Sequence, residues 1–142
     1  MNASQRPLWF WIVAVLALLW NLLGVLMFCR QVTMTPEALA ALPLEQQQVI
    51  AATPGWVNVF YAIAVFAGAL GSLGLVLRKR WAVTLLLLSL LGVLADMLAL
   101  YATTPLWSLT GAAGTAFPLL LIAICLLLWL FARRAAARGW IA

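Results

Sequence analysis

Four long apolar segments decide what this chain can fold into. We place them at Leu8–Phe28, Trp56–Leu77, Ala82–Tyr101 and Phe117–Ala132. An α-helix rises 1.5 Å per residue, so about 20 apolar residues are enough to cross the ~30 Å hydrocarbon layer of a bilayer. Each segment is close to that length. The sequence therefore predicts an all-α protein, an integral membrane four-helix bundle.

The composition leaves no room for a second kind of domain. Of the 142 residues, 68% are hydrophobic and only 8% are charged, whereas soluble domains contain about 25% charged residues. The four segments take up more than half of the chain, so a separate soluble domain of ordinary size is not expected. We predict a single membrane domain over residues 1–142, with a helical outer loop at 30–55.

The positions of the basic residues predict the orientation. One precedes the first span, three join the second span to the third, and three follow the fourth: Arg6; Arg78, Lys79 and Arg80; Arg133, Arg134 and Arg138. Loops rich in Lys and Arg stay in the cytoplasm, so both termini are expected there. The net charge of +5 does not indicate nucleic-acid binding, because no basic domain lies outside the spans.

The loop between the first two spans is predicted to contain two short helices. Thr35 is a suitable N-cap for a helix with Pro36 at its first position and Glu37 in its first turn. A second helix over 44–52 is expected to stop before Pro54. The loop is interpreted either as a fixed cap on the bundle or as a mobile lid over a pocket.

Small and polar residues recur at helical spacing in three of the spans. The seams are Ala14, Ala17, Asn21 and Gly24; Tyr61, Ala64, Gly68 and Gly71; and Ser89, Gly92, Asp96 and Ala99. Small residues let transmembrane helices approach closely, and polar ones form hydrogen bonds across the contact. The fourth span has no such seam, so we expect it to face lipid most.

Asp96 is the one acid inside a span. A charge at the bilayer centre costs roughly 2.5–3.5 kcal/mol on insertion scales, so such residues usually have a partner or a task. Counting along the helices puts Asn21 at the depth of Asp96 and Tyr61 about a turn away. We predict an intramembrane polar site of Asn21, Tyr61 and Asp96, rimmed by Arg30 and Trp20, in which burial favours the neutral acid.

Little catalytic chemistry is available. The chain has no histidine, which removes His-based metal sites and the most common acid–base catalyst. It also lacks a C-x-x-C motif and a Gly-rich phosphate loop next to a lysine. We therefore expect no catalytic residues, no metal and no cofactor, and we expect that the protein is not an enzyme.

Five stretches, "LWNLLGVLMF", "TPEALAALP", "ATPGW", "AVFAGALGSLGLVLRKRWAV" and "LLLWLFARRAAARGWI", resemble an uncharacterised family of small four-span bacterial inner-membrane proteins. Members of that family are sometimes labelled "sugar transporter". The resemblance covers nearly the whole chain and implies a multi-pass protein of the bacterial inner (cytoplasmic) membrane. It implies no catalytic residues.

Three functions remain open from the sequence. The first is a non-enzymatic accessory or self-associating membrane protein, whose partners are the lipid bilayer and a second copy or another membrane protein. The second is a small transporter with its site around Asp96 and an unidentified small-molecule substrate. Because four spans are expected to enclose little volume, it would work as a dimer. The third, a membrane enzyme, is disfavoured by the missing chemistry.

Overall fold

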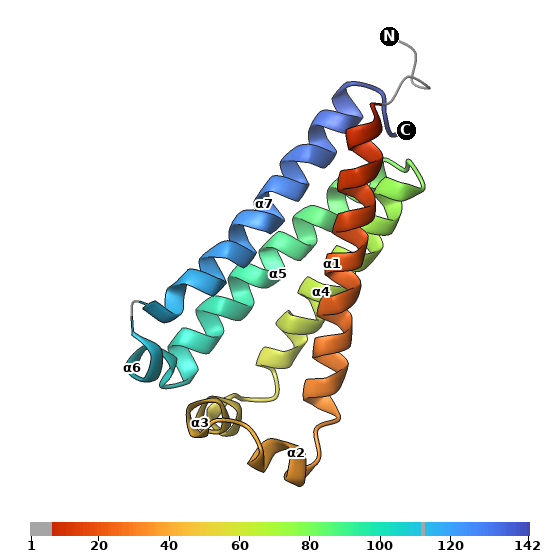
Figure 1. Cartoon of the computed structure of the whole chain (residues 1–142). Coiled ribbons are helices and arrows are strands. Elements are labelled where there is room, and N and C mark those ends of the chain that lie inside the picture. The colour runs from red at the N-terminus through yellow and green to blue at the C-terminus, as the bar shows by residue number, and fades with distance from the viewer. Residues whose placement is uncertain (1–6, 112) are drawn as a thin grey trace.

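The computed structural model describes residues 7–111 and 113–142, and in that part of the chain every regular element is helical. Four helices are long and apolar enough to cross a membrane: α1 (Leu8–Val32), α4 (Val57–Val76), α5 (Trp81–Thr103) and α7 (Ala116–Ala137) (Figure 1). The predicted all-α four-helix bundle is confirmed, and the chain is a multi-pass membrane protein. Arg6 lies outside the described residues.

Three of the long helices continue past the predicted ends of their spans, α5 by the smallest margin, to Thr103 instead of Tyr101. The first span was expected to end at Phe28, but α1 runs through Arg30 to Val32. The fourth was expected to end at Ala132, and α7 continues through Arg134 to Ala137. Charged residues mark where a helix leaves hydrocarbon, but Arg and Ala are good helix formers and do not end it.

The connections between the long helices contain the predicted short helices. In α2 (Pro36–Ala40) the Thr35 hydroxyl accepts a hydrogen bond from the Ala38 N–H at 3.2 Å, which is the expected N-cap. After it comes α3 (Leu44–Ala52), and the α5–α7 connection holds α6 (Leu106–Thr110) and a 3₁₀ turn at Ala113–Thr115. All of these lie at one end of the bundle, which we call the loop end (Figure 1).

The long helices pack in the order α1, α4, α5, α7. The contact between α4 and α5 is the most extensive, and α1 packs on α4 as α7 packs on α5. A Cβ added to Gly92 would lie only 2.9 Å from the backbone nitrogen of Ala64, so α4 and α5 touch backbone to backbone. Close approach of this kind is what the small-residue seams predicted.

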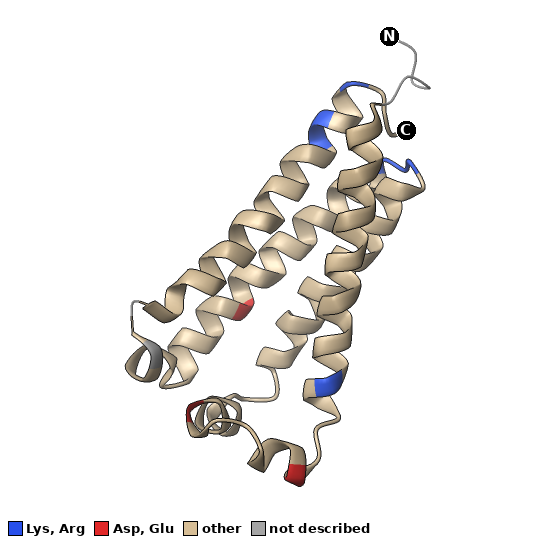
Figure 2. Cartoon of the chain, viewed as in Figure 1, with Lys and Arg blue, Asp and Glu red and all other residues tan. Residues whose placement is uncertain are grey.

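The opposite end of the bundle, which we call the basic end, carries Arg78, Lys79, Arg80, Arg133, Arg134 and Arg138 (Figure 2). Rings from the two outer helices meet here, because Phe10 on α1 stacks on Phe131 of α7 with centroids 5.6 Å apart. Trp140 packs edge-on against Trp9 at 5.2 Å. The helices α1 and α7 are thus joined at this end.

Residues 138–142 form a clasp over the basic end. The chain turns at Gly139, whose φ of 73° suits glycine. It then pairs with the α4–α5 turn: the Arg80 N–H donates to the Ala142 carbonyl at 2.8 Å, and the Ala142 N–H donates to the Arg78 carbonyl at 3.0 Å. This turn buries Trp140 to 2% exposure.

Candidate functional site

The helices enclose a cavity of about 850 Å³, bordered by α1, α4, α5 and α7 and by α3 at the loop end. All five residues predicted for the polar site line it: Trp20, Asn21, Arg30, Tyr61 and Asp96. Its volume lies within the roughly 300–1,000 Å³ of small-molecule sites. A space of that size therefore lies between the helices of a single chain, and it is partly open at the surface.

Asp96 forms part of the cavity wall on α5. The residue is only 6% exposed, although α5 is a membrane-spanning helix with no other charged side chain. Because it is buried and still borders the cavity, its carboxyl group meets the cavity rather than lipid. Among the described residues that line this space, Asp96 is the one acid and Arg30 the one base.

Asn21 does not use its amide on Asp96. Its Nδ2 group donates to the Ala17 carbonyl at 2.8 Å and to the Ser72 hydroxyl at 3.0 Å. Asn21 reaches Ser72 by passing over Gly68, where an added Cβ would collide with Asn21 Oδ1. The hydrogen bonding of Asn21 therefore differs from the prediction. Asn21 joins α1 to α4 at the end of the cavity that is nearer the basic end.

The predicted depth of Asn21 is also wrong. Next to Gly68 lies the Ser89 hydroxyl, 2.9 Å from the position of an added Cβ, which puts Asn21, Gly68 and Ser89 at one level. Asp96 is seven residues further along α5, about 10 Å nearer the loop end. The prediction measured depth along α1 from Leu8 and along α5 from Trp81, and it assumed that both helices start at the same level. However, α1 starts further towards the basic end, where Phe10 packs against Trp140.

Tyr61 is the true neighbour of Asp96 in depth. It lies seven residues from Gly68 on α4, in the same direction as Asp96 lies from Ser89, and both Tyr61 and Asp96 line the cavity. Phe28 of α1 holds the Tyr61 ring from the other side, with centroids 5.1 Å apart. Tyr61 of α4 and Asp96 of α5 thus form one polar level of the cavity, and Phe28 of α1 packs against the Tyr61 ring.

The polar residues of the cavity that were missed as site residues include Asn58, Ser89 and Cys125. Asn58 lies one turn from Tyr61 on α4, and Ser89 lies two turns from Asp96 on α5, so helical spacing could have identified both. Ser89 is 3% exposed and donates to the Ala64 carbonyl at 2.6 Å. Cys125 of α7 lies beside the Ser89 hydroxyl. No signal pointed to Cys125, because the fourth span has no polar seam.

The cavity is open on the side between α1 and α7. Several residues that line it are also exposed at the protein surface, including Trp20 (38%), Met27 (44%) and Phe117 (61%). The first two lie on α1 and the third on α7, the two helices that meet mainly at the basic end. In a membrane this opening faces hydrocarbon. At the loop end, Val49 and Ile50 of α3 cover the cavity.

The lining of the cavity is mostly apolar and carries few ionisable groups. Within residues 7–111 and 113–142, no group of three or more His, Cys, Asp or Glu residues is placed to hold a metal ion. The cavity combines apolar walls with one acid and a few hydroxyl and amide groups. Comparison with protein-family models, with curated proteins and with solved structures found no significant match to this chain.

Proposed function

We propose that this chain is a non-enzymatic carrier of the bacterial inner membrane that binds a small amphipathic cation in its cavity. The observation that carries the proposal is the cavity of about 850 Å³ within one chain, with the buried Asp96 on its wall. A membrane helix keeps an acid at such a depth when the acid has a partner or a task. In this proposal a single chain forms the whole site, so a dimer is not needed for volume.

The walls support an amphipathic ligand. Apolar side chains such as Leu23, Val93 and Leu121 make up most of the lining, while Asp96 and Tyr61 form one polar level. A molecule with an apolar body and one polar head matches this division. The opening between α1 and α7 lets such a molecule enter directly from the bilayer, where amphipathic compounds concentrate.

The charges support a cationic head group. Asp96 is only 6% exposed, and no basic side chain forms an ion pair with it within the described residues. Arg30 is exposed, so its long side chain can keep its charged group in the interfacial water. An ammonium group in the cavity would give the Asp96 carboxylate the partner that it lacks.

The two ends of the bundle support a carrier. The clasp and the rings of Phe10 and Phe131 close the basic end, while the cavity reaches towards the loop end under α3. A cavity that reaches towards only one end of the bundle supports one state of an alternating carrier. The positions of the basic residues support a cytoplasmic location for the closed end, under the positive-inside rule.

Binding is tested with three probes that share a ten-carbon chain: decyltrimethylammonium, decanol and decyl sulfate. We expect the cation to raise the melting temperature of the purified protein in detergent, and the other two to have little effect. Asp96→Asn should remove the response to the cation. Glu45→Gln, which changes an exposed acid of α3 outside the cavity, should keep it. Equal responses to all three probes would reject a cation site.

Transport is tested separately in proteoliposomes. Decyltrimethylammonium keeps its charge at every pH, so its uptake requires a carrier, and we expect uptake by the wild type and none by Asp96→Asn. Binding without uptake would reject the carrier and leave a binding protein. The absence of both would favour the accessory or self-associating protein that the sequence also allows.

A further inference from the structure

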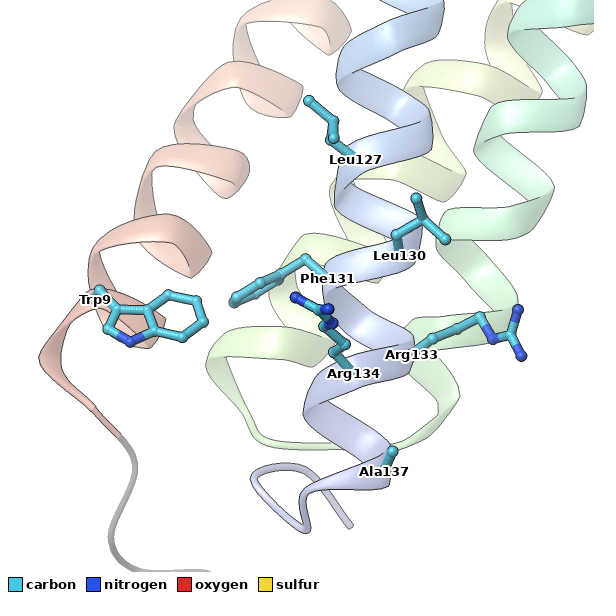
Figure 3. Close-up of a pocket in the computed structure, with 7 residues that line it drawn as sticks. All are labelled: Trp9, Leu127, Leu130, Phe131, Arg133, Arg134 and Ala137. Atoms are coloured by element: carbon cyan, nitrogen blue, oxygen red, sulfur yellow. The ribbon is translucent and has the colours of Figure 1, made fainter.

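A second hollow lies at the basic end, outside the cavity described above. It has a volume of about 680 Å³ and lies between Trp9 of α1 and the last turns of α7 (Figure 3). Figure 3 shows Phe131 and Arg134 pointing towards Trp9 across this gap, while Arg133 points to the other side of α7. We define the residues that line it, Trp9, Leu127, Leu130, Phe131, Arg133, Arg134 and Ala137, as the basic-end groove.

From the groove we infer a binding site for one anionic phospholipid, with its phosphate at Arg134 and an acyl chain along α7. This inference is independent of the proposed carrier function, because none of the groove residues lines the larger cavity.

The order of the residues along the groove matches the order of groups in a phospholipid. Leu127 and Leu130 are 65% and 42% exposed and lie towards the middle of the bundle, where acyl chains are found. Trp9 comes next, at the level that tryptophan prefers between hydrocarbon and water. Arg134 is seven residues beyond Leu127, about 10 Å along α7, which is the direction of the head groups.

The charge at this end also favours an anion. The chain has three acids, Glu37, Glu45 and Asp96, and none of them belongs to the basic end. Arg133 is held over the Trp129 ring at 5.1 Å and Arg138 over the Trp140 ring at 5.4 Å, so two of the arginines are committed to aromatic faces. Arg134 remains directed into the groove, where a phosphate can accept its hydrogen bonds.

The test compares lipid adducts of the purified protein by native mass spectrometry, with phosphatidylglycerol and phosphatidylcholine of identical chains. We expect one tightly held phosphatidylglycerol and a clear preference over phosphatidylcholine. Arg134→Gln should weaken that preference about fivefold, the effect of one cationic contact at a lipid surface. The matched control is Arg78→Gln, an exposed arginine of the α4–α5 turn that lines neither the groove nor the larger cavity, which should leave the preference unchanged.

A second measurement needs no Arg134 variant and therefore does not depend on its folding. Lipids with bromine atoms on their chains quench tryptophan, and the difference between wild type and Trp9→Phe isolates the signal of Trp9. Brominated phosphatidylglycerol should quench Trp9 more strongly than brominated phosphatidylcholine at equal mole fraction. Three outcomes would overturn the inference. The two lipids could quench Trp9 equally, or the two arginine variants could lose the phosphatidylglycerol preference equally. A lipid-free dimer with its contact on the groove would also overturn it.

Discussion

The amide of Asn21 donates a hydrogen bond to the hydroxyl of Ser72 across 3.0 Å, and this contact ties α1 to α4 at the inner boundary of the cavity. Ser72 is completely buried, so no water competes for its hydroxyl. Gly68 makes the contact possible because it leaves the path of the Asn21 side chain free. Between this hydrogen bond and the loop end, the cavity lies between the long helices.

Removing either side of this contact should destabilise the protein. We expect Asn21→Ala and Ser72→Ala each to cost about 0.5–2 kcal/mol of unfolding free energy in detergent, as found for hydrogen bonds between transmembrane helices. The double variant should cost less than the sum of the two single variants, because they remove the same bond. Ser108→Ala, at an exposed position of α6, serves as the control. Strictly additive losses would show that the two residues act separately.

The glycines of the seams should differ in their tolerance of a methyl group. At Gly92 an added Cβ meets the backbone of Ala64 at 2.9 Å, which cannot move without shifting α4. At Gly24 it meets only Val65 Cγ1, at 3.3 Å. We therefore expect Gly92→Ala to lose about 1–3 kcal/mol through overpacking. Gly24→Ala should lose less, since alanine favours a helix by about 1 kcal/mol. Denaturant titration of both variants gives the order, and a reversed order would contradict the packing described for α4 and α5.

The clasp should contribute strongly to stability through Trp140. This side chain is 2% exposed and lies in the core with Phe10 and Leu75. Trp140→Ala should cost about 3–5 kcal/mol, the usual range for a buried aromatic residue. Trp107→Ala removes the same ring at a 56% exposed position and should have a small effect. The melting temperatures of the two variants check this prediction. An equal decrease in both would show that the clasp contributes little to stability.

Asp96 should be more important for binding than for stability. Because the Asn21 amide donates to Ser72, it keeps this hydrogen bond when Asp96 is replaced. We expect Asp96→Leu to keep its unfolding free energy within about 1 kcal/mol of wild type or to exceed it, since a buried acid is costly in a membrane. The same variant should lose binding of decyltrimethylammonium. A large drop in stability would instead identify Asp96 as a structural residue.

The architecture could be predicted because it depends on local sequence. Four apolar segments of sufficient length specify the helices, and the cap at Thr35 specifies the start of α2. The seam residues Gly68 and Gly92 could also be assigned to helix contacts, because helical spacing alone places them on one face. These features require no knowledge of how one helix is displaced along another.

The details of the site depend on that displacement and could not be predicted. Asn21 and Asp96 were expected at one depth, but the contact of Phe10 with Trp140 moves the start of α1 outwards relative to α5. The cavity itself results from helices that are joined by rings at one end and lie apart at the other. The residue pattern of a single helix does not determine the angle between two helices.

The pairing of Ala142 with Arg78 and Arg80 also has a consequence for biosynthesis. A membrane protein is inserted from its N-terminus, so the α4–α5 hairpin can assemble while α7 is still being made. The ring of Phe10 is synthesised early but is covered only after Trp140 has been added to the chain. A chain stalled before Gly139 would contain all four helices but would leave this aromatic surface uncovered, so residues 139–142, which are translated after α7, decide when the basic end is closed.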